Sequence, residues 1–153
     1  MKWWYNGKEF KDEDVPEGAV GFIYAIKITI DERPKMYIGK KNFYSNRKVK
    51  KGKKELAAMK DKRGSKYKLV RKLNYEKYHS SNKQIKEAVK NGTPCKKYIL
   101  RICFSKMELT YQETRYLFKL DVLLDDKYLN DNILGRFYRS KLNPNTDNNE
   151  STI

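Results

Sequence analysis

One carboxylate occupies a position where helical spacing favours an apolar side chain. Glu113 follows Leu109 by four residues and precedes Tyr116 and Leu117 by three and four, so it lies on or beside an apolar stripe. A carboxylate placed there needs a partner, because burying an unpaired charge costs free energy. The residue alone leaves two interpretations open: an ion pair with one of the many Lys or Arg side chains, or a ligand for a metal ion.

A second candidate is a glycine followed by two lysines, Gly39-Lys40-Lys41, directly after Tyr37-Ile38. Glycine allows a backbone to come close to a phosphate, and the two ammonium groups would neutralise its charge. The pattern equally fits an ordinary glycine at the end of a strand. A phosphate site and a simple strand end are therefore both compatible with this segment.

Two tyrosines, Tyr24 and Tyr37, stand at predicted strand positions. A phenol has an ordinary pKa of about 10. A metal ion and lysines nearby would lower that pKa, and the phenol could then act as a general base. The alternative is that both tyrosines are aromatic core residues.

Three predicted strands would position these side chains. Residues 20–30 alternate with a period of two, which predicts a strand. The residues on one face of this strand are Phe22, Tyr24, Ile26, Ile28 and Ile30. A turn at residues 31–34 leads to a second strand over 35–38, and so short a connection favours antiparallel pairing. A third strand is predicted over residues 97–104.

Helix signals separate and follow these strands. Helix-forming residues occur over 53–62 and again over 66–77. Ser81-Asn82-Lys83-Gln84 has the form of a capping box, and Asn91-Gly92 ends the helix that it opens. A second capping box, Ser105-Lys106-Met107-Glu108, opens a long helix that carries Glu113 and ends at about Leu124. The predicted fold class is therefore α/β, of the α+β kind.

The chain divides into three predicted segments. Asn6-Gly7 between aromatic residues predicts a hairpin, which together with a connector forms residues 1–19. Residues 20–141 form the main domain, and residues 142–153 are polar and predicted to be disordered.

The charge of the chain indicates its partner. The 153 residues include 35 Lys or Arg and 19 Asp or Glu, which gives a net charge of +16. Between Arg47 and Lys72 thirteen cationic residues stand against two acids, Glu55 and Asp61. Self-repulsion destabilises such a compact chain, and a polyanion such as nucleic acid offsets it. A solvated basic surface without a specific partner is the alternative.

Other features exclude several classes of protein. No run of about 18 apolar residues predicts a membrane-spanning helix, and the N-terminus lacks the apolar core of a signal peptide. The two cysteines, Cys95 and Cys103, are expected to be reduced thiols in a cytosolic protein.

Two spaced motifs resemble the signature of the GIY-YIG nuclease family. Gly21-Phe22-Ile23-Tyr24 is followed after twelve residues by Tyr37-Ile38-Gly39. Gly21 stands one place earlier than the family's glycine, whereas Tyr24 is retained. The runs at residues 37–43 and 128–133 look most like phage-encoded, Seg-type homing endonucleases of this family, and the resemblance covers about residues 20–137.

The resemblance extends to single residues. Lys40 directly follows the glycine, as in excision-repair members, and Arg47 stands eight residues after that glycine, as the family's helical arginine does. Glu113, in a helix after the third strand, matches the family's single metal-binding glutamate. Asn130 is similar to a late asparagine of the family, and His79 belongs to a His-Ser-Ser similar to that of phage homing members.

The resemblance implies a three-stranded antiparallel sheet flanked by helices and hydrolysis of phosphodiester bonds in DNA. Glu113 would hold one divalent cation, Mg²⁺ or Mn²⁺, and Tyr24 or Tyr37 would take a proton from the attacking water. Lys40 and Arg47 would stabilise charge on the phosphate. Asn130 would orient a partner. His79 would support a residue that contacts the substrate, or it would relay a proton. The alternative is that His79 is a surface histidine just before a helix.

The basic segment would follow the DNA backbone. The residues expected to contact DNA are Gly39, Lys41, Lys50, Lys51, Lys53, Lys54, Arg63 and Lys66. We expect a monomer that could form a transient dimer on DNA. We expect it in the cytoplasm, which is that of the host cell if the protein is phage-encoded. Two other classes stay open: a non-catalytic nucleic-acid-binding protein derived from such a nuclease, and an RNA-directed nuclease. A carboxylate facing the phosphate would be unfavourable in a protein that only binds.

Overall fold

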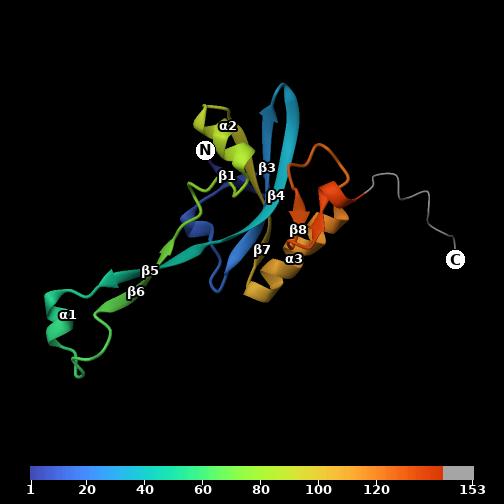
Figure 1. Cartoon of the computed structure of the whole chain (residues 1–153). Helices are drawn as coiled ribbons and strands as arrows, with labels where there is room; N and C mark the ends of the chain where they lie inside the picture. The colour runs from blue at the N-terminus through green and yellow to red at the C-terminus, as the bar shows by residue number, and fades with distance from the viewer. Residues whose placement is uncertain (143–153) are drawn as a thin grey trace.

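The computed structural model describes residues 1–142, and at its centre is a five-stranded mixed sheet (Figure 1). β3 (Gly21–Ile30) and β4 (Arg33–Asn42) pair antiparallel over their whole length, and β7 (Cys95–Cys103) pairs antiparallel with β3 on its other side. A two-residue turn, Asp31-Glu32, joins β3 to β4, and its φ angles of +50° and +61° suit the twist of paired strands. The predicted antiparallel pairing is confirmed, and the second strand is longer than predicted.

The N-terminal hairpin belongs to this sheet, which therefore has five strands instead of the predicted three. β1 (Trp3–Tyr5) and β2 (Lys8–Phe10) pair through Asn6-Gly7, and β1 also pairs parallel with β7. Trp3 is 1% exposed, with its ring packed edge-on against two aromatic rings of β3. The three-strand prediction was wrong because joining the sheet lets the hairpin bury this indole in the core.

Helices cover both faces of the sheet. Even-numbered residues of β3 share one hydrophobic core with Ile85 of α2 (Lys83–Lys90). Odd-numbered residues of β3 share a second core with Leu109 of α3 (Lys106–Lys119). β3 is therefore buried on both faces, and the sheet is the layer that positions everything else.

The two capping boxes have different outcomes. α3 begins after Ser105, whose Oγ accepts a hydrogen bond from the backbone N–H of Glu108 at 3.0 Å, as predicted. α2 begins one residue later than its box predicts, because Asn82 is the cap and its Oδ1 accepts from the Ile85 N–H at 3.2 Å. Ser81 therefore remains outside the helix and contacts β4 instead.

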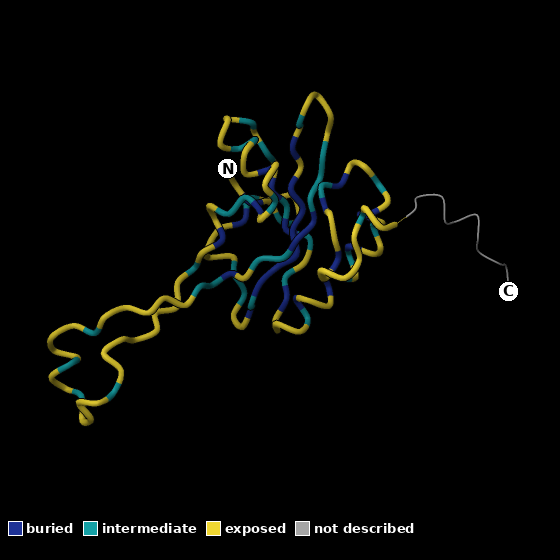
Figure 2. Tube along the Cα trace, in the orientation of Figure 1, coloured by how far each residue is buried: buried dark blue, intermediate teal, exposed yellow. Residues whose placement is uncertain are grey.

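Residues 44–73 form an arm that projects from the remaining described residues, which we call the body (Figure 1). β5 (Tyr44–Lys50) pairs antiparallel with β6 (Tyr67–Leu73), and their connection contains the short α1 (Lys53–Ala57). No residue of the arm is buried (Figure 2). Residues 66–77, which were predicted to favour a helix, contain the strand β6 instead. A helix here would need an apolar stripe to pack against the body, whereas pairing with β5 satisfies the backbone groups of β6 without one.

Short elements complete the described chain. They are β8 (Asn132–Ile133), β9 (Phe137–Tyr138) and two 3₁₀ helices, Asp12–Asp14 and Arg139–Lys141. The predicted disordered tail, residues 142–153, lies outside the described residues except for Leu142. Both cysteines are free thiols. Among the described helices, none has the length and apolar character that crossing a bilayer requires.

Candidate active site

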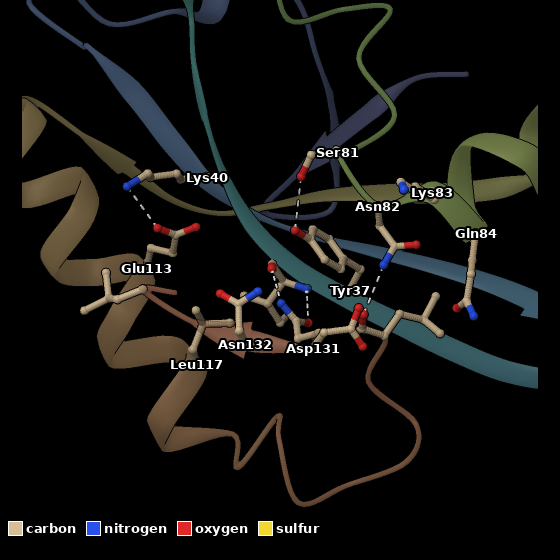
Figure 3. A pocket seen from close by; sticks show the side chains of 14 residues that line it. Tyr37, Lys40, Ser81, Asn82, Lys83, Gln84, Glu113, Leu117, Asp131 and Asn132 are labelled. Carbon is tan, nitrogen blue, oxygen red and sulfur yellow. Dashed lines mark hydrogen bonds and ion pairs between the residues drawn. The ribbon is translucent and has the colours of Figure 1, made fainter. Parts of the chain in front are cut away.

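A cavity of about 750 Å³ opens at the outer edge of β4 (Figure 3). Tyr37 and the start of α2 lie on one side of this strand, and Lys40 and Glu113 lie on the other. The residues that line the cavity are Tyr37, Ile38, Lys40, Ser81, Asn82, Lys83, Gln84, Glu113, Leu117, Leu129, Asn130, Asp131, Asn132 and Leu134. Four predicted catalytic residues, Tyr37, Lys40, Glu113 and Asn130, therefore meet at one site.

The strand register explains the two sides. Tyr37 and Gly39 are paired with Ile26 and Tyr24 of β3, so these four residues share the face that α2 covers. Lys40 follows Gly39 and pairs with Ile23, so it takes the opposite face, on the side of α3. β4 thus carries the phenol of Tyr37 on one face and the ammonium group of Lys40 on the other.

Gly39 has a packing role that its position in the sequence does not reveal. A Cβ at this position would lie 2.7 Å from Tyr24 Oη and 3.0 Å from Tyr37 Cε1. Such contacts are closer than packed atoms allow, so any larger residue would displace the tyrosine rings. The glycine therefore permits both phenols to converge on β4, which is a more specific function than ending a strand.

Tyr24 is closed off from solvent. It is 1% exposed, and its hydroxyl donates to Tyr78 Oη at 3.4 Å. Burial raises its pKa far above the ordinary value, and the neighbouring Tyr78 raises it further. The structure therefore places Tyr24 among the buried aromatic residues of the core, and Tyr24 does not line the cavity.

Tyr37 lines the cavity, and its hydroxyl lies 3.3 Å from Ser81 Oγ. Partial burial raises the pKa of Tyr37, and the contact with Ser81 opposes this effect. The groups around Tyr37 therefore do not lower its pKa as the sequence predicted. A bound cation would be needed to lower it. Of the two tyrosines, Tyr37 is the one that reaches the cavity.

Glu113 forms an ion pair with Lys40 inside the cavity. Lys40 Nζ lies 3.0 Å from Glu113 Oε2 and also donates to Thr110 Oγ1 at 3.0 Å. The two side chains are 35% and 19% exposed, so the carboxylate faces the cavity and is not buried in the core. The predicted ion-pair contact is therefore present, and both of its residues line the cavity.

The oxygen donors of the cavity suit a hard divalent cation. Glu113 and Asp131 supply carboxylates, and an ion such as Mg²⁺ commonly binds one or two carboxylates, with waters and substrate phosphate as its other ligands. The described residues contain no group of three or more His, Cys, Asp or Glu that would enclose a metal completely. The donor set therefore fits an open, phosphate-sharing ion. Sequence reasoning missed Asp131, although it directly follows the predicted Asn130.

Asn130 holds the edge strand in place. It is 4% exposed, and its Oδ1 accepts from the Ile38 N–H at 3.1 Å while its Nδ2 donates to the Ile38 carbonyl at 2.8 Å. The amide thus imitates a neighbouring strand, since both backbone groups of an edge residue are satisfied. Asn130 is therefore a positioning residue for the flanking Tyr37 and Gly39.

A buried lysine, missed by the sequence analysis, supports the segment that carries Ser81. Lys97 is 0% exposed, and its Nζ donates to the carbonyls of Glu76 and Tyr78 at 2.7 and 3.3 Å. The ammonium also lies 4.6 Å from the centre of the Trp3 ring. Burial lowers the pKa of Lys97 to about 8. Period-two alternation was an available signal, because Lys97 pairs with Ile26 and shares its buried face.

His79 does not line the cavity. It is half-buried in the segment that Lys97 holds, and burial lowers its pKa. Its neighbour Ser80 has a φ of +94°, a conformation that few non-glycine residues adopt. The contribution of this His-Ser-Ser to the cavity is therefore Ser81 and not the predicted imidazole.

Arg47 lies outside the cavity. It is exposed on strand β5 and not in a helix as the resemblance implied, because the arm occupies this part of the chain. The predicted DNA-contacting residues on the same arm are Lys50, Lys51, Lys53, Lys54, Arg63 and Lys66. Lys41 stays on the body, with its Nζ 4.7 Å from the centre of the Tyr78 ring.

Comparison with known proteins identifies the family. The family model described as "Putative endonuclease segE, GIY-YIG domain" matches residues 3–133. The searches of curated proteins and of solved structures find no match. The matched range contains the N-terminal hairpin, the arm and every cavity residue except Leu134. The chain therefore belongs to the SegE-type GIY-YIG endonuclease domain family.

Proposed function

We propose that the chain is a metal-dependent endonuclease that hydrolyses phosphodiester bonds in DNA. One observation carries the proposal: the Lys40–Glu113 pair and the Tyr37 hydroxyl line one cavity at the edge of the sheet. A carboxylate can hold a metal ion, an ammonium can stabilise charge on a phosphate, and a phenol can transfer a proton. The net charge of +16 favours a polyanionic substrate.

Lys40 and Glu113 would have different electrostatic roles, with Lys40 contacting the phosphate and Glu113 binding the cation. When DNA binds, the Lys40 ammonium can move from the carboxylate to a phosphate oxygen, since both groups are partly exposed. Glu113 and Asp131 would then hold Mg²⁺ or Mn²⁺, which when bound polarises the phosphate and stabilises the leaving oxygen. Lys40 would stabilise the charge that develops on the phosphate.

Tyr37, after its phenol has lost its own proton to solvent, would take the proton of the attacking water as a phenolate. It is preferred to Tyr24 because its hydroxyl lines the cavity, whereas Tyr24 is 1% exposed. Its raised pKa means that it can act as a base only near added positive charge, so the reaction depends on the cation. Ser81 would orient the phenol through the 3.3 Å contact between the two hydroxyls.

The biological role proposed is that of a phage homing or DNA-processing nuclease acting in the host cytoplasm. A monomer with one cavity cuts one strand per visit, so cleavage of both strands would need transient pairing on DNA. A non-catalytic DNA-binding role is the second candidate. In that role the Lys40–Glu113 ion pair would be structural, because the ammonium satisfies the carboxylate without a metal.

A plasmid-nicking assay with and without Mg²⁺ tests the proposal. Glu113→Gln should slow nicking by about 1,000-fold or more, because the cation that it binds supplies several kcal/mol. Glu87→Gln, an exposed position on α2, is the matched control and should nick at the wild-type rate. The melting temperature should change little, since partly exposed ion pairs contribute roughly 0–1 kcal/mol.

The second candidate makes the opposite prediction. A wild-type protein that binds DNA but does not nick it in Mg²⁺ or Mn²⁺ would establish the non-catalytic role. Nicking by Glu113→Gln at a rate close to wild type would remove Glu113 from the mechanism.

A further inference from the structure

Most of the chain's excess charge lies on the arm. Residues 47–72 contain thirteen Lys or Arg and two acids, so they carry +11 of the total +16. No arm residue is buried, and none lines the cavity at β4. The arm's charge therefore needs a partner outside the chain.

The arm has two different faces, because paired residues of β5 and β6 point the same way. One face, which we call the helix face, includes Lys68, whose Nζ pairs with Glu55 of α1. The opposite face, which we call the open face, consists of Tyr44, Asn46, Lys48, Lys50, Tyr67, Leu69, Arg71 and Leu73. Tyr44 and Leu73, at the base of the arm, pack against the core of the body, and the other six lie beyond it. The contact with Glu55 places α1 beside the helix face at the end of the arm, away from the open face.

The open face combines positive charge with exposed apolar surface. Leu69 is 68% exposed and Tyr67 is 54% exposed, and Lys48 and Lys50 are their cross-strand partners. Arg71 lies with its guanidinium carbon 3.8 Å from the centre of the Tyr44 ring, which holds the planar group on this face. Cations suit phosphates, while a fixed arginine and apolar side chains suit base edges and thymine methyl groups.

We propose that the open face of the arm lies in the major groove of duplex DNA. The major groove is roughly 12 Å wide and admits a two-stranded β-ribbon. Seven residues of β5 span about 23 Å at about 3.3 Å per residue, which corresponds to roughly seven base pairs. The choice of DNA rests on the proposed endonuclease function. The major groove of an RNA duplex is too deep and narrow for such a ribbon.

The base of the arm connects this groove contact firmly to the cavity. β5 begins only two residues after the end of β4, and the intervening Phe43 is 0% exposed. Phe43 donates its N–H to the Val20 carbonyl and accepts from the Asn74 N–H, at 3.0 and 2.8 Å. The arm would therefore fix the distance between the base pairs that it contacts and the phosphate that is cut.

An arm-shortened variant tests the inference. Ser45 and Lys72 are cross-strand partners, so Asn-Gly can replace residues 46–71 as a two-residue turn. Binding to a fluorescent 30-base-pair duplex is measured by anisotropy at 50–200 mM salt, with Glu113→Gln in every protein to prevent cleavage. At 100 mM salt we expect at least 100-fold weaker binding. Loss of about six phosphate contacts would also reduce the salt slope by about five.

Two point variants separate the faces. Arg71→Ala on the open face and Lys72→Ala on the helix face each remove one positive charge from neighbouring positions. We expect about tenfold weaker binding for Arg71→Ala and a two- to threefold change for Lys72→Ala, because only the first also loses base contacts. Methyl green, which occupies the major groove, should displace the full-length protein, and netropsin, which occupies the minor groove, should not.

Several outcomes would overturn the inference. They are duplex binding within about threefold of wild type by a folded arm-shortened protein, equal losses for Arg71→Ala and Lys72→Ala, displacement by netropsin alone, and equal affinity for an RNA duplex of the same sequence. If the shortened chain does not fold, the point variants and competitors decide the question. Because binding is measured without cleavage, failure of Mg²⁺-dependent nicking would remove the endonuclease proposal and leave this inference standing.

Discussion

The body and the arm of this protein differ in how their side chains are held in place. In the body, β3 is buried on both faces and aromatic rings pack edge to face around Trp3, so side chains at the edge of the sheet have fixed positions. In the arm no residue is buried, and the two strands are held mainly by their own hydrogen bonds and by cross-strand contacts. Side chains with fixed positions thus lie on the body, whereas most of the chain's excess positive charge lies on the arm.

The distribution of charge follows the same division. Residues 47–72 carry +11, and the rest of the chain carries the remaining +5. Concentrating like charges in a compact core would be destabilising, but on an extended ribbon they are solvated and screened within about 10 Å. The arm can therefore carry a high density of positive charge at a lower cost in stability than a compact body would.

The largest expected difference between the regions is in stability. Trp3→Ala should lower the free energy of unfolding by roughly 3–5 kcal/mol, because it leaves a cavity beneath two aromatic rings of β3. Leu69→Ala on the arm, where the side chain is 68% exposed, should change it by less than about 0.5 kcal/mol. Urea denaturation followed by tryptophan fluorescence or circular dichroism measures both. A large loss from Leu69→Ala would show that the arm packs against something in solution.

The second difference concerns rate against affinity. Lys40→Gln should slow single-turnover nicking at saturating protein by about 100-fold, because Lys40 lies at the cavity beside Glu113. Arg47→Gln should weaken DNA binding about two- to fivefold and leave the saturated rate near wild type, because Arg47 is exposed on the arm. A 100-fold fall in the saturated rate of Arg47→Gln would show that the arm folds back to complete the cavity on DNA.

The smallest effect expected is a pH dependence from one lysine of the body. Burial lowers the pKa of Lys97 from about 10.5 to about 8. Below pH 8 the native protein bears the cost of a buried charge; between pH 8 and 10.5 folding releases a proton, so stability rises with pH. From pH 7.5 to 9.5 the stability of wild type relative to Lys97→Met should therefore rise by roughly 2 kcal/mol.

Denaturation curves of both proteins at the two pH values measure this change. The two proteins share the same tyrosines and cysteines, so titration of those groups largely cancels in the comparison. A relative stability that stays constant or falls with pH would mean that Lys97 keeps its proton in the folded protein at pH 9.5.

Local patterns predicted the parts of the fold that lie within one element or one turn. The period-two alternation of residues 20–30, the Asn6-Gly7 hairpin and the Ser105 cap appear in the structure as predicted. The helical position of Glu113 was also predicted, and it placed the carboxylate at the cavity. Each of these signals depends on residues within a few positions of one another.

Other predictions failed where a partner distant in the chain decided the outcome. Residues 67–73 contain helix formers, yet they form β6 because β5 offers a strand to pair with. The hairpin became part of the sheet because β7 offered an edge to β1. Arg47 was expected in a helix near the site, and the β5–β6 pairing carries it onto the arm instead.

The sequence by itself determined the chemical inventory of this protein: the two tyrosines, Gly39-Lys40 and Glu113, with their order and local spacing. The tertiary structure decided which of these groups meet. Asn130 and Ile38 are 92 residues apart, yet their paired hydrogen bonds fix the edge strand, and burial separates the closed Tyr24 from the accessible Tyr37. Such contacts depend on how the layers pack, which no local periodicity specifies, because a buried position and an exposed one follow the same alternation along a strand.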